Sequence, residues 1–417
     1  MRTKIKDKLW ILLIILAVMS YILTAINLIY NNKYVLWTIN NANIDGGIIY
    51  KIFPYLKDII AIFLFIVLAL NNKKNLKIIL IFVTIVCLGS MIIWLNNGND
   101  NDNLLYIIAG IRMLLYFIVA MMYCLSVNDY KLVSLKLFKV IKVMILVEFF
   151  IVYIQIMRSE NIHNIGNGAY RFCGTFGNAA GLAYFCIAAC LYILIYKNIF
   201  NNGNGMKKNY VYYALIMALV LATGSRTGIL SCIIIIFMYI INELLKSNII
   251  SKKNMYIFVM ILTIFIIPLI YNLMIKFVNR GALMDSGATR IDIFLLLFDL
   301  KNTNFLKFIF GYGIGYGTNN AVILGIKNAS IIDSTFGTIM VQYGILGLGI
   351  FIITLFYIVK KVFRYSSKCG GIFTAIAYIV PIFLVTIAGN IFEQIVLAML
   401  LCYMFYCMKN NYYIKQK

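Results

Sequence analysis

The sequence predicts an all-α integral membrane protein that crosses the bilayer many times. Hydrophobic residues make up 63% of the 417 residues, charged residues only 12%, and the mean hydropathy is +0.93. Soluble domains carry roughly 25% charged residues, so this composition is typical of a polytopic membrane protein. Apolar runs near the length that crosses a hydrocarbon core of about 30 Å follow one another along the chain.

About twelve such runs are separated by mostly short polar connections. The first run lacks a small-residue cleavage site after it, so we expect a retained helix rather than a removed signal peptide. No internal repeat or soluble domain interrupts the pattern, which predicts one membrane domain, 1–417, with a single large loop at 276–334. The expected spans are residues 9–29, 52–70, 78–95, 104–125, 138–157, 177–196, 209–224, 227–245, 255–275, 335–359, 371–388 and 392–410.

The distribution of Lys and Arg predicts the orientation. Most of the 37 basic residues lie at alternate ends of the expected spans, together with both chain termini. Because basic residues near the ends of spans stay on the cytoplasmic side, we expect both termini in the cytoplasm and the 276–334 loop on the external face.

Composition also argues against several classes of function. A net charge of +23 would indicate nucleic-acid binding in a soluble protein, but here the charges lie in short connections and favour contact with anionic lipid. The nine cysteines form no CxxC pair, and His163 is the only histidine. We therefore expect neither a disulfide framework nor a metal site, and no cofactor.

Three arginines on the expected external side go against the positive-inside trend and are candidate anion ligands. Arg226 lies in TGSRTG, a tight reversal between two spans, where it would bind either a phosphate or a lipid headgroup. Arg171 begins RFCGTFGNAAGLAYF, whose small residues suit helix packing as well as a ligand. Arg290 begins SGATRIDIFLLLFDL, which predicts an amphipathic helix roofing a cavity.

Carboxylates supply the remaining candidates. Asp333 precedes an expected span, where a carboxylate most often caps the helix but is also able to take a proton from a sugar hydroxyl. Arg112 and Glu148 lie inside the fourth and fifth expected spans at similar depth, so we predict a structural ion pair, with a wall of the active cavity as the alternative. Glu393 is a weaker candidate of the same kind.

The GYGIGYG segment near the end of the large loop has the glycine content of a nucleotide-binding fingerprint. It lacks the preceding strand and the following helix of that fingerprint, and it lies on the wrong side of the membrane for ATP or NAD. We interpret it as a turn that folds the loop back over the membrane.

Taken together, GTFGN with its small-residue helix, the TGSRTG hairpin, the large external loop and a closing DS-x9-GILG resemble the superfamily of O-antigen polymerases and O-antigen ligases. The closing motif here is Asp333 and Ser334, nine further residues, and then Gly344 to Gly347. Ligases typically carry His at the first position, so Asp favours the polysaccharide repeat-unit polymerase branch. The likeness covers roughly residues 170–400.

This resemblance implies a metal-independent glycosyltransferase with a glycosyltransferase-C-like helical fold in a bacterial cytoplasmic (inner) membrane. Its partners would be a glycan donor and an acceptor, both linked to undecaprenyl pyrophosphate, with membrane lipid, a chain-length regulator and a flippase as further partners. Arg171, Arg226 and Arg290 would neutralise the pyrophosphate leaving group, and Asp333 would deprotonate the acceptor hydroxyl. The product would be O-antigen of lipopolysaccharide, or capsule.

Two other functions remain open at this point. A ligase would move the finished glycan to a different acceptor, and a lipid-linked oligosaccharide flippase would transport without chemistry. A flippase should place cations along a path through the membrane. Here the cations that go against the positive-inside trend lie on the expected external side, and the only charges deeper in the membrane are those of Arg112 and Glu148, which favours an enzyme.

Overall fold

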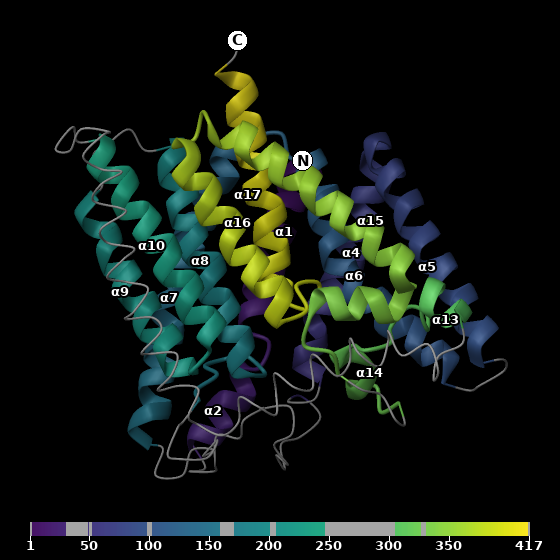
Figure 1. Cartoon of the computed structure of the whole chain (residues 1–417). Coiled ribbons are helices and arrows are strands. Elements are labelled where there is room, and N and C mark those ends of the chain that lie inside the picture. Colours follow the sequence, from purple (N-terminus) through teal and green to yellow (C-terminus); the bar gives the residue numbers. More distant parts are fainter. Residues whose placement is uncertain are drawn as a thin grey trace.

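The computed structural model describes residues 2–30, 49, 52–97, 102–158, 171–200, 206–246, 305–326 and 331–415. These residues form helices and short 3-10 turns, without a β-sheet among them (Figure 1). The α-helices are α1 Arg2–Val18, α2 Ile22–Tyr30, α4 Leu56–Asn71, α5 Leu76–Asn97, α6 Asn103–Ser126, α7 Tyr130–Arg158, α8 Ala179–Phe200, α9 Met206–Thr223, α10 Arg226–Lys246, α13 Phe305–Phe310, α14 Asn319–Ile323, α15 Thr335–Ser366, α16 Gly371–Ala388 and α17 Ile395–Ile414.

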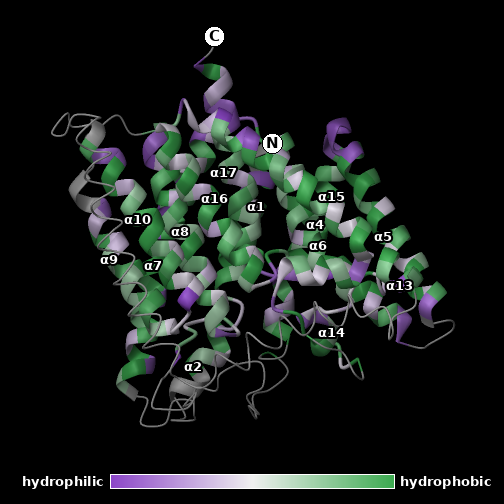
Figure 2. Ribbon diagram, viewed as in Figure 1, coloured by the Kyte–Doolittle hydropathy of each residue, from purple (hydrophilic) through white to green (hydrophobic). Residues whose placement is uncertain are grey.

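The predicted all-α membrane class is confirmed in its coarse form. Nine helical stretches in the described part of the chain are long and apolar enough to cross a membrane, and α9 contributes a shorter apolar helix. The helix α17 covers most of the expected span 392–410, whereas the expected span 255–275 lies outside the described residues. Figure 2 shows hydrophobic residues along the helices and hydrophilic residues concentrated near their ends.

Two of the differences from the expected boundaries have identifiable reasons. The first expected span is divided between α1 and α2, and the backbone N–H of Tyr21 at this break donates to the Thr175 carbonyl at 3.1 Å. The helix α7 begins eight residues earlier than expected, because the side chain of Asp129 accepts a hydrogen bond from the N–H of Leu132 at 3.0 Å and so caps its start.

The centre of the bundle is α8, most of whose residues are buried and which packs against α9, α10 and α17. Its sequence AAGLAYFCIAACLYILIY is apolar on every side, which is the pattern of a helix enclosed by other helices. The same core includes a contact between α1 and α6: the rings of Trp10 and Tyr123 stack at 4.5 Å, and both side chains are fully buried.

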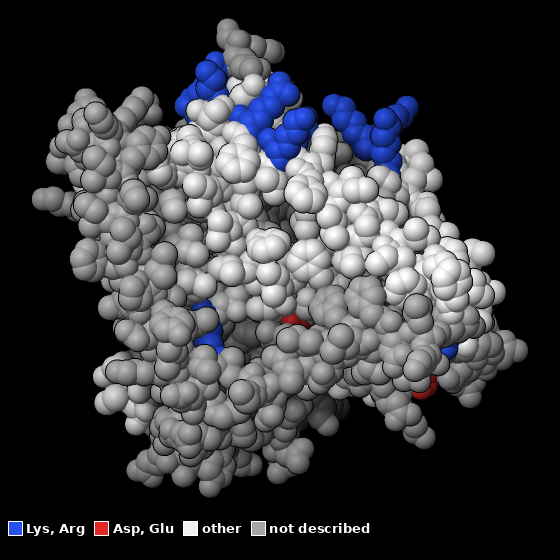
Figure 3. Space-filling view, viewed as in Figure 1, with Lys and Arg blue, Asp and Glu red and all other residues white. Residues whose placement is uncertain are grey.

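The helix α15 is bent at Gly344, where φ is 63° and ψ is −162°. A Cβ atom at this glycine would overlap the carbonyl oxygen of Ile309 in α13, so glycine alone fits the bend. In Figure 1 the green first limb of α15 runs across the molecule before the longer limb rises towards the end where both termini lie. Figure 3 shows Lys and Arg gathered at that same end of the viewed face.

The GYGIGYG segment, residues 311–317, forms turns, as expected, and its central residue inserts between two helices. We refer to this segment as the wedge. Gly311, Gly313, Gly315 and Gly317 all have positive φ. Ile314, at the centre, is fully buried and packs where α5 and α6 each present a glycine, Gly89 and Gly110. This wedge fixes the position of α14, which follows it.

Candidate functional site

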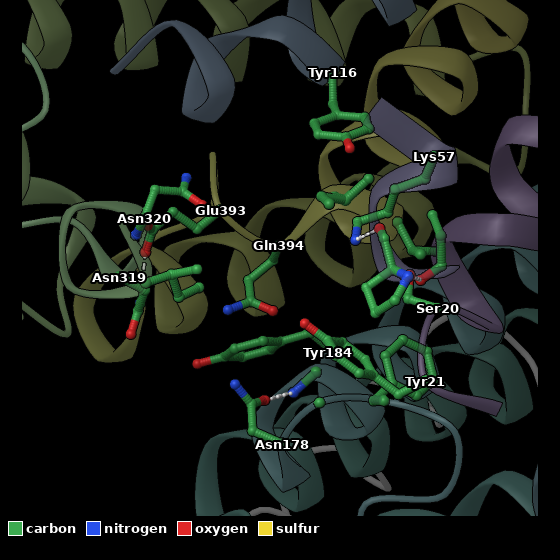
Figure 4. A pocket seen from close by; sticks show the side chains of 18 of the residues that line it. Ser20, Tyr21, Lys57, Tyr116, Asn178, Tyr184, Asn319, Asn320, Glu393 and Gln394 are labelled. Atoms are coloured by element: carbon green, nitrogen blue, oxygen red, sulfur yellow. Dashed lines mark hydrogen bonds between the residues drawn. The ribbon is translucent and has the colours of Figure 1, made fainter. Parts of the chain in front are cut away.

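A cavity of about 720 Å³ is lined in part by α14 and by the break after α1, which lie towards the end of the bundle away from the chain termini (Figure 1). Its wall combines the break after α1, the starts of α4, α8 and α17, the middle of α6, α14, and the connection between α16 and α17. Tyr and Phe side chains line it beside charged and amide groups: Lys57, Arg112, Asn178, Asn319, Glu393 and Gln394 (Figure 4). Apolar surfaces with a few polar groups are typical of small-molecule sites.

One side of the cavity carries two cations from neighbouring helices. The ammonium group of Lys57 donates to the Pro54 carbonyl at 2.6 Å, and the side chain is buried. The guanidinium group of Arg112 forms an ion pair with Asp58 at 3.0 Å, and the Tyr116 hydroxyl donates to the other oxygen of the same carboxylate. Asp58 therefore joins α4 to α6 and orients Arg112.

The facing wall carries the partly buried carboxylate of Glu393, in the segment between α16 and α17. Its two oxygens accept hydrogen bonds from the Asn319 side chain at 2.6 Å and the Asn320 N–H at 3.3 Å. Burial raises the pKa of Glu393 to about 7; these hydrogen bonds lower it in part, and the charge of Asp333 raises it. Glu393 thus titrates near neutral pH at the edge of the cavity.

Asp333 is exposed and close enough to Glu393 to affect its pKa, but it does not line the cavity itself. The second residue after it is anchored to the α16–α17 connection, where the N–H of Thr335 donates to the Gly389 carbonyl at 3.0 Å. The cap of α15 is Ser334, whose hydroxyl accepts from the N–H of Gly337 at 3.3 Å. Helix capping therefore does not account for Asp333.

The structure brings two of the three predicted arginines together. Arg171 precedes α8, and Arg226 is the first residue of α10. Partial burial lowers the pKa of Arg171, and the nearby positive charge of Arg226 lowers it further. The N–H of Phe172 donates to the Ala222 carbonyl at 3.1 Å and holds this segment against the end of α9. Arg290 lies outside the described residues, as does His163.

The predicted ion pair between Arg112 and Glu148 is wrong. The helix α6 packs against α4, α5 and α17, whereas α7 packs against α8, α9 and α1, so these two helices, although consecutive in sequence, do not pack closely against each other. Glu148 is fully buried, and its carboxylate accepts hydrogen bonds from the N–H and hydroxyl of Thr175. The alternative, that the two residues form a wall of the cavity, holds for Arg112 alone.

Sequence reasoning missed Lys57 and the amide groups of Asn178, Asn319 and Gln394. Lys57 did leave a signal, since it stands beside Asp58 at the expected external end of a span, where a cation is unusual. The amides left none. Asn178 serves also as the cap of α8, accepting from the N–H of Gly181 at 2.6 Å.

No group of three or more His, Cys, Asp or Glu side chains that could hold a metal occurs among the described residues.

In comparisons with known proteins, no protein-family model and no curated protein matches the chain. The fold and cavity define a polytopic helical membrane protein with a polar site at one end of its bundle.

Proposed function

We propose that the protein is a glycosyltransferase that polymerises undecaprenyl-pyrophosphate-linked repeat units into O-antigen or capsular polysaccharide. The reaction takes place on the external face of a bacterial cytoplasmic membrane, within a glycosyltransferase-C-like fold of about twelve spans. The observation that carries the proposal is the pair of carboxylates, Asp333 and Glu393, at the edge of a large cavity whose opposite wall is cationic.

The chemistry follows from these groups. Asp333 accepts the proton of the acceptor hydroxyl while that oxygen forms a bond to the anomeric carbon of the donor. The bond between the anomeric carbon and the phosphate oxygen breaks, and undecaprenyl pyrophosphate leaves as an anion. The neighbouring charges of Arg171 and Arg226 stabilise this leaving group.

The cavity wall suits a glycan. Sugars present apolar C–H faces that pack on rings such as those of Tyr21 and Tyr184, and hydroxyls that pair with amides such as Asn178 and Gln394. Figure 4 shows the Tyr184 ring and the Asn178 amide on the same side of the pocket.

The test is chain growth by the purified full-length protein in detergent, supplied with lipid-linked repeat units. We expect a ladder of products, reduced roughly 10²–10⁴-fold by Asp333→Asn, the loss typical of a general base. Arg226→Gln should also shorten the ladder, while the exposed Lys136→Gln serves as a matched control. A detergent solution has no compartments, so chain growth there excludes transport alone. Its absence with authentic substrate would favour the flippase, and transfer to a different acceptor would favour the ligase.

A further inference from the structure

The cation pair of Lys57 and Arg112 is not used by the reaction as described. Both side chains line the cavity, and Lys57 is only 6% exposed. Figure 4 shows Lys57 reaching into the pocket on the side facing Glu393 and Asn319. A buried cation in a membrane protein is costly and calls for a partner or a ligand.

The protein groups around this pair leave a net positive charge. Asp58 balances Arg112, and the Pro54 carbonyl takes one of the three ammonium hydrogens of Lys57. The remaining ionisable carboxyl group of the cavity wall, Glu393, has a pKa of about 7 and carries only part of a charge at neutral pH. The cavity is therefore suited to an anion on the α4–α6 side.

This pair is separate from the arginines that support the leaving group. Lys57 and Arg112 belong to α4 and α6, whereas Arg171 precedes α8 and Arg226 begins α10. Only the first pair lines the cavity. A polymerase of lipid-linked units binds two phosphate-bearing lipids at once. One pair of cations for each lipid would give both pairs a role.

We propose that Lys57 and Arg112 bind the pyrophosphate of the second lipid-linked substrate, the acceptor. The proposal rests on the proposed function for the identity of that substrate. Arg112 presents its fork of N–H donors in an orientation fixed by Asp58, and Lys57 adds a compact charge beside it. The apolar residues Ile395, Val396 and Leu397 of the same cavity provide a surface for the start of the polyprenyl chain.

The experiment measures how many equivalents of sugar-free undecaprenyl pyrophosphate bind to the full-length protein in detergent. We expect two equivalents for the wild type. Lys57→Gln should weaken one of them at least 10-fold, Lys57→Arg should restore it, and Arg171→Gln should weaken the other. The matched control is Lys74→Gln, an exposed lysine in the 3-10 turn Lys73–Asn75 that follows the other end of α4. Unchanged binding of both equivalents by a folded Lys57→Gln protein overturns the proposal.

A second measurement needs no substitution. A photo-crosslinkable undecaprenyl pyrophosphate on the wild-type protein should label peptides of α4 or α6 as well as those around Arg171 and Arg226. Labelling of the latter alone overturns the proposal. Inorganic pyrophosphate should compete poorly for the Lys57-dependent equivalent, and competition equal to that of the lipid would indicate a free-anion site instead.

The two proposals fail in different ways. Two bound equivalents, one of which depends on Lys57, without chain growth on authentic substrate, would reject the polymerase and keep the anion site. Chain growth with lipid binding that is unaffected in Lys57→Gln would keep the polymerase and reject this site.

Discussion

The Oε2 atom of Glu393 accepts a hydrogen bond from the Asn319 side chain at 2.6 Å, which joins α14 to the connection between α16 and α17. The helix α14 comes directly after the glycine-rich wedge, and the α16–α17 connection holds the start of α15 through Thr335 and Gly389. The Glu393 carboxylate therefore links α14 to the connection that in turn holds the start of α15, so its protonation state affects both stability and the site.

The first prediction concerns the pH dependence of stability. The pKa of Glu393 rises from 4.5 to about 7 on folding, so the folded protein binds a proton more tightly than the unfolded chain. This contribution to the free energy of unfolding is fully present below pH 4.5 and is lost as pH rises through 7. Its full size is up to about 3 kcal/mol, before screening by solvent.

Thermal unfolding of the purified protein between pH 5 and 8 measures the effect. The melting temperature of the wild type should fall over this range more steeply than that of Glu393→Gln, which cannot titrate. Parallel curves for the two proteins would contradict the assignment of the raised pKa to Glu393.

The second prediction concerns the wedge. An alanine at position 110 would overlap the Ile314 side chain, and one at position 89 would come within 2.6 Å of its Cβ atom. Overpacking of this kind costs about 1–3 kcal/mol. Gly110→Ala should therefore lower the melting temperature, and adding Ile314→Ala should cost less than the sum of the two single changes, because the new methyl group occupies space that Ile314 vacates.

The control for the wedge is Gly349→Ala in α15, where a Cβ atom meets nothing within 4 Å. This substitution should leave the melting temperature unchanged or raise it slightly, since alanine favours helix. If the stability losses of Gly110→Ala and Ile314→Ala instead added up in the double variant, these two residues would not pack as described.

The sequence predicted where the helices lie along the chain better than it predicted which helices pack against each other, for a physical reason. The length of an apolar run is a local property, so most expected spans along the described chain match helices to within about four residues. The exceptions are the starts of α1 and α7 and the end of α15, where the helices extend seven or eight residues further than expected. Which helix packs against which depends on the whole bundle. Arg112 was therefore assigned to Glu148 on the next helix in sequence, whereas its partner Asp58 lies on α4.

The same distinction applies to the candidate site. Arg171 and Arg226 were chosen one by one for going against the charge bias, and the structure places their charges close together. The cavity itself was not predictable, because its wall combines residues as far apart in sequence as Ser20 and Gln394. Asp333 was predicted by its motif, while Glu393, which lines the cavity, was ranked below it.

The third prediction concerns Glu148. Its carboxylate accepts from the Thr175 N–H at 3.0 Å and from the Thr175 hydroxyl, and no ion pair of Glu148 occurs among the described residues. A glutamine retains one oxygen as an acceptor, so Glu148→Gln should cost at most about 1–2 kcal/mol, less than Glu148→Ala, which leaves both donors of Thr175 without this acceptor. Thermal unfolding of the two variants measures the difference. Equal losses would indicate that charge, rather than hydrogen bonding, matters at this position.

The last prediction separates the two residues at the start of α15. The Ser334 hydroxyl accepts from the N–H of Gly337, so Ser334→Ala should lower stability by about 1 kcal/mol, the usual cost of a lost cap. Asp333 is exposed and does not cap the helix, so Asp333→Asn should change stability by no more than about 0.5 kcal/mol.

Thermal unfolding and chain growth, measured on the same two preparations, distinguish structure from catalysis. We expect Asp333→Asn to retain its melting temperature and lose chain growth, and Ser334→Ala to lose stability while keeping part of its activity. If Asp333→Asn instead lost as much stability as Ser334→Ala, its carboxylate would have a structural role. Glu393 would then be the better candidate for the base, because it lines the cavity and titrates near neutral pH.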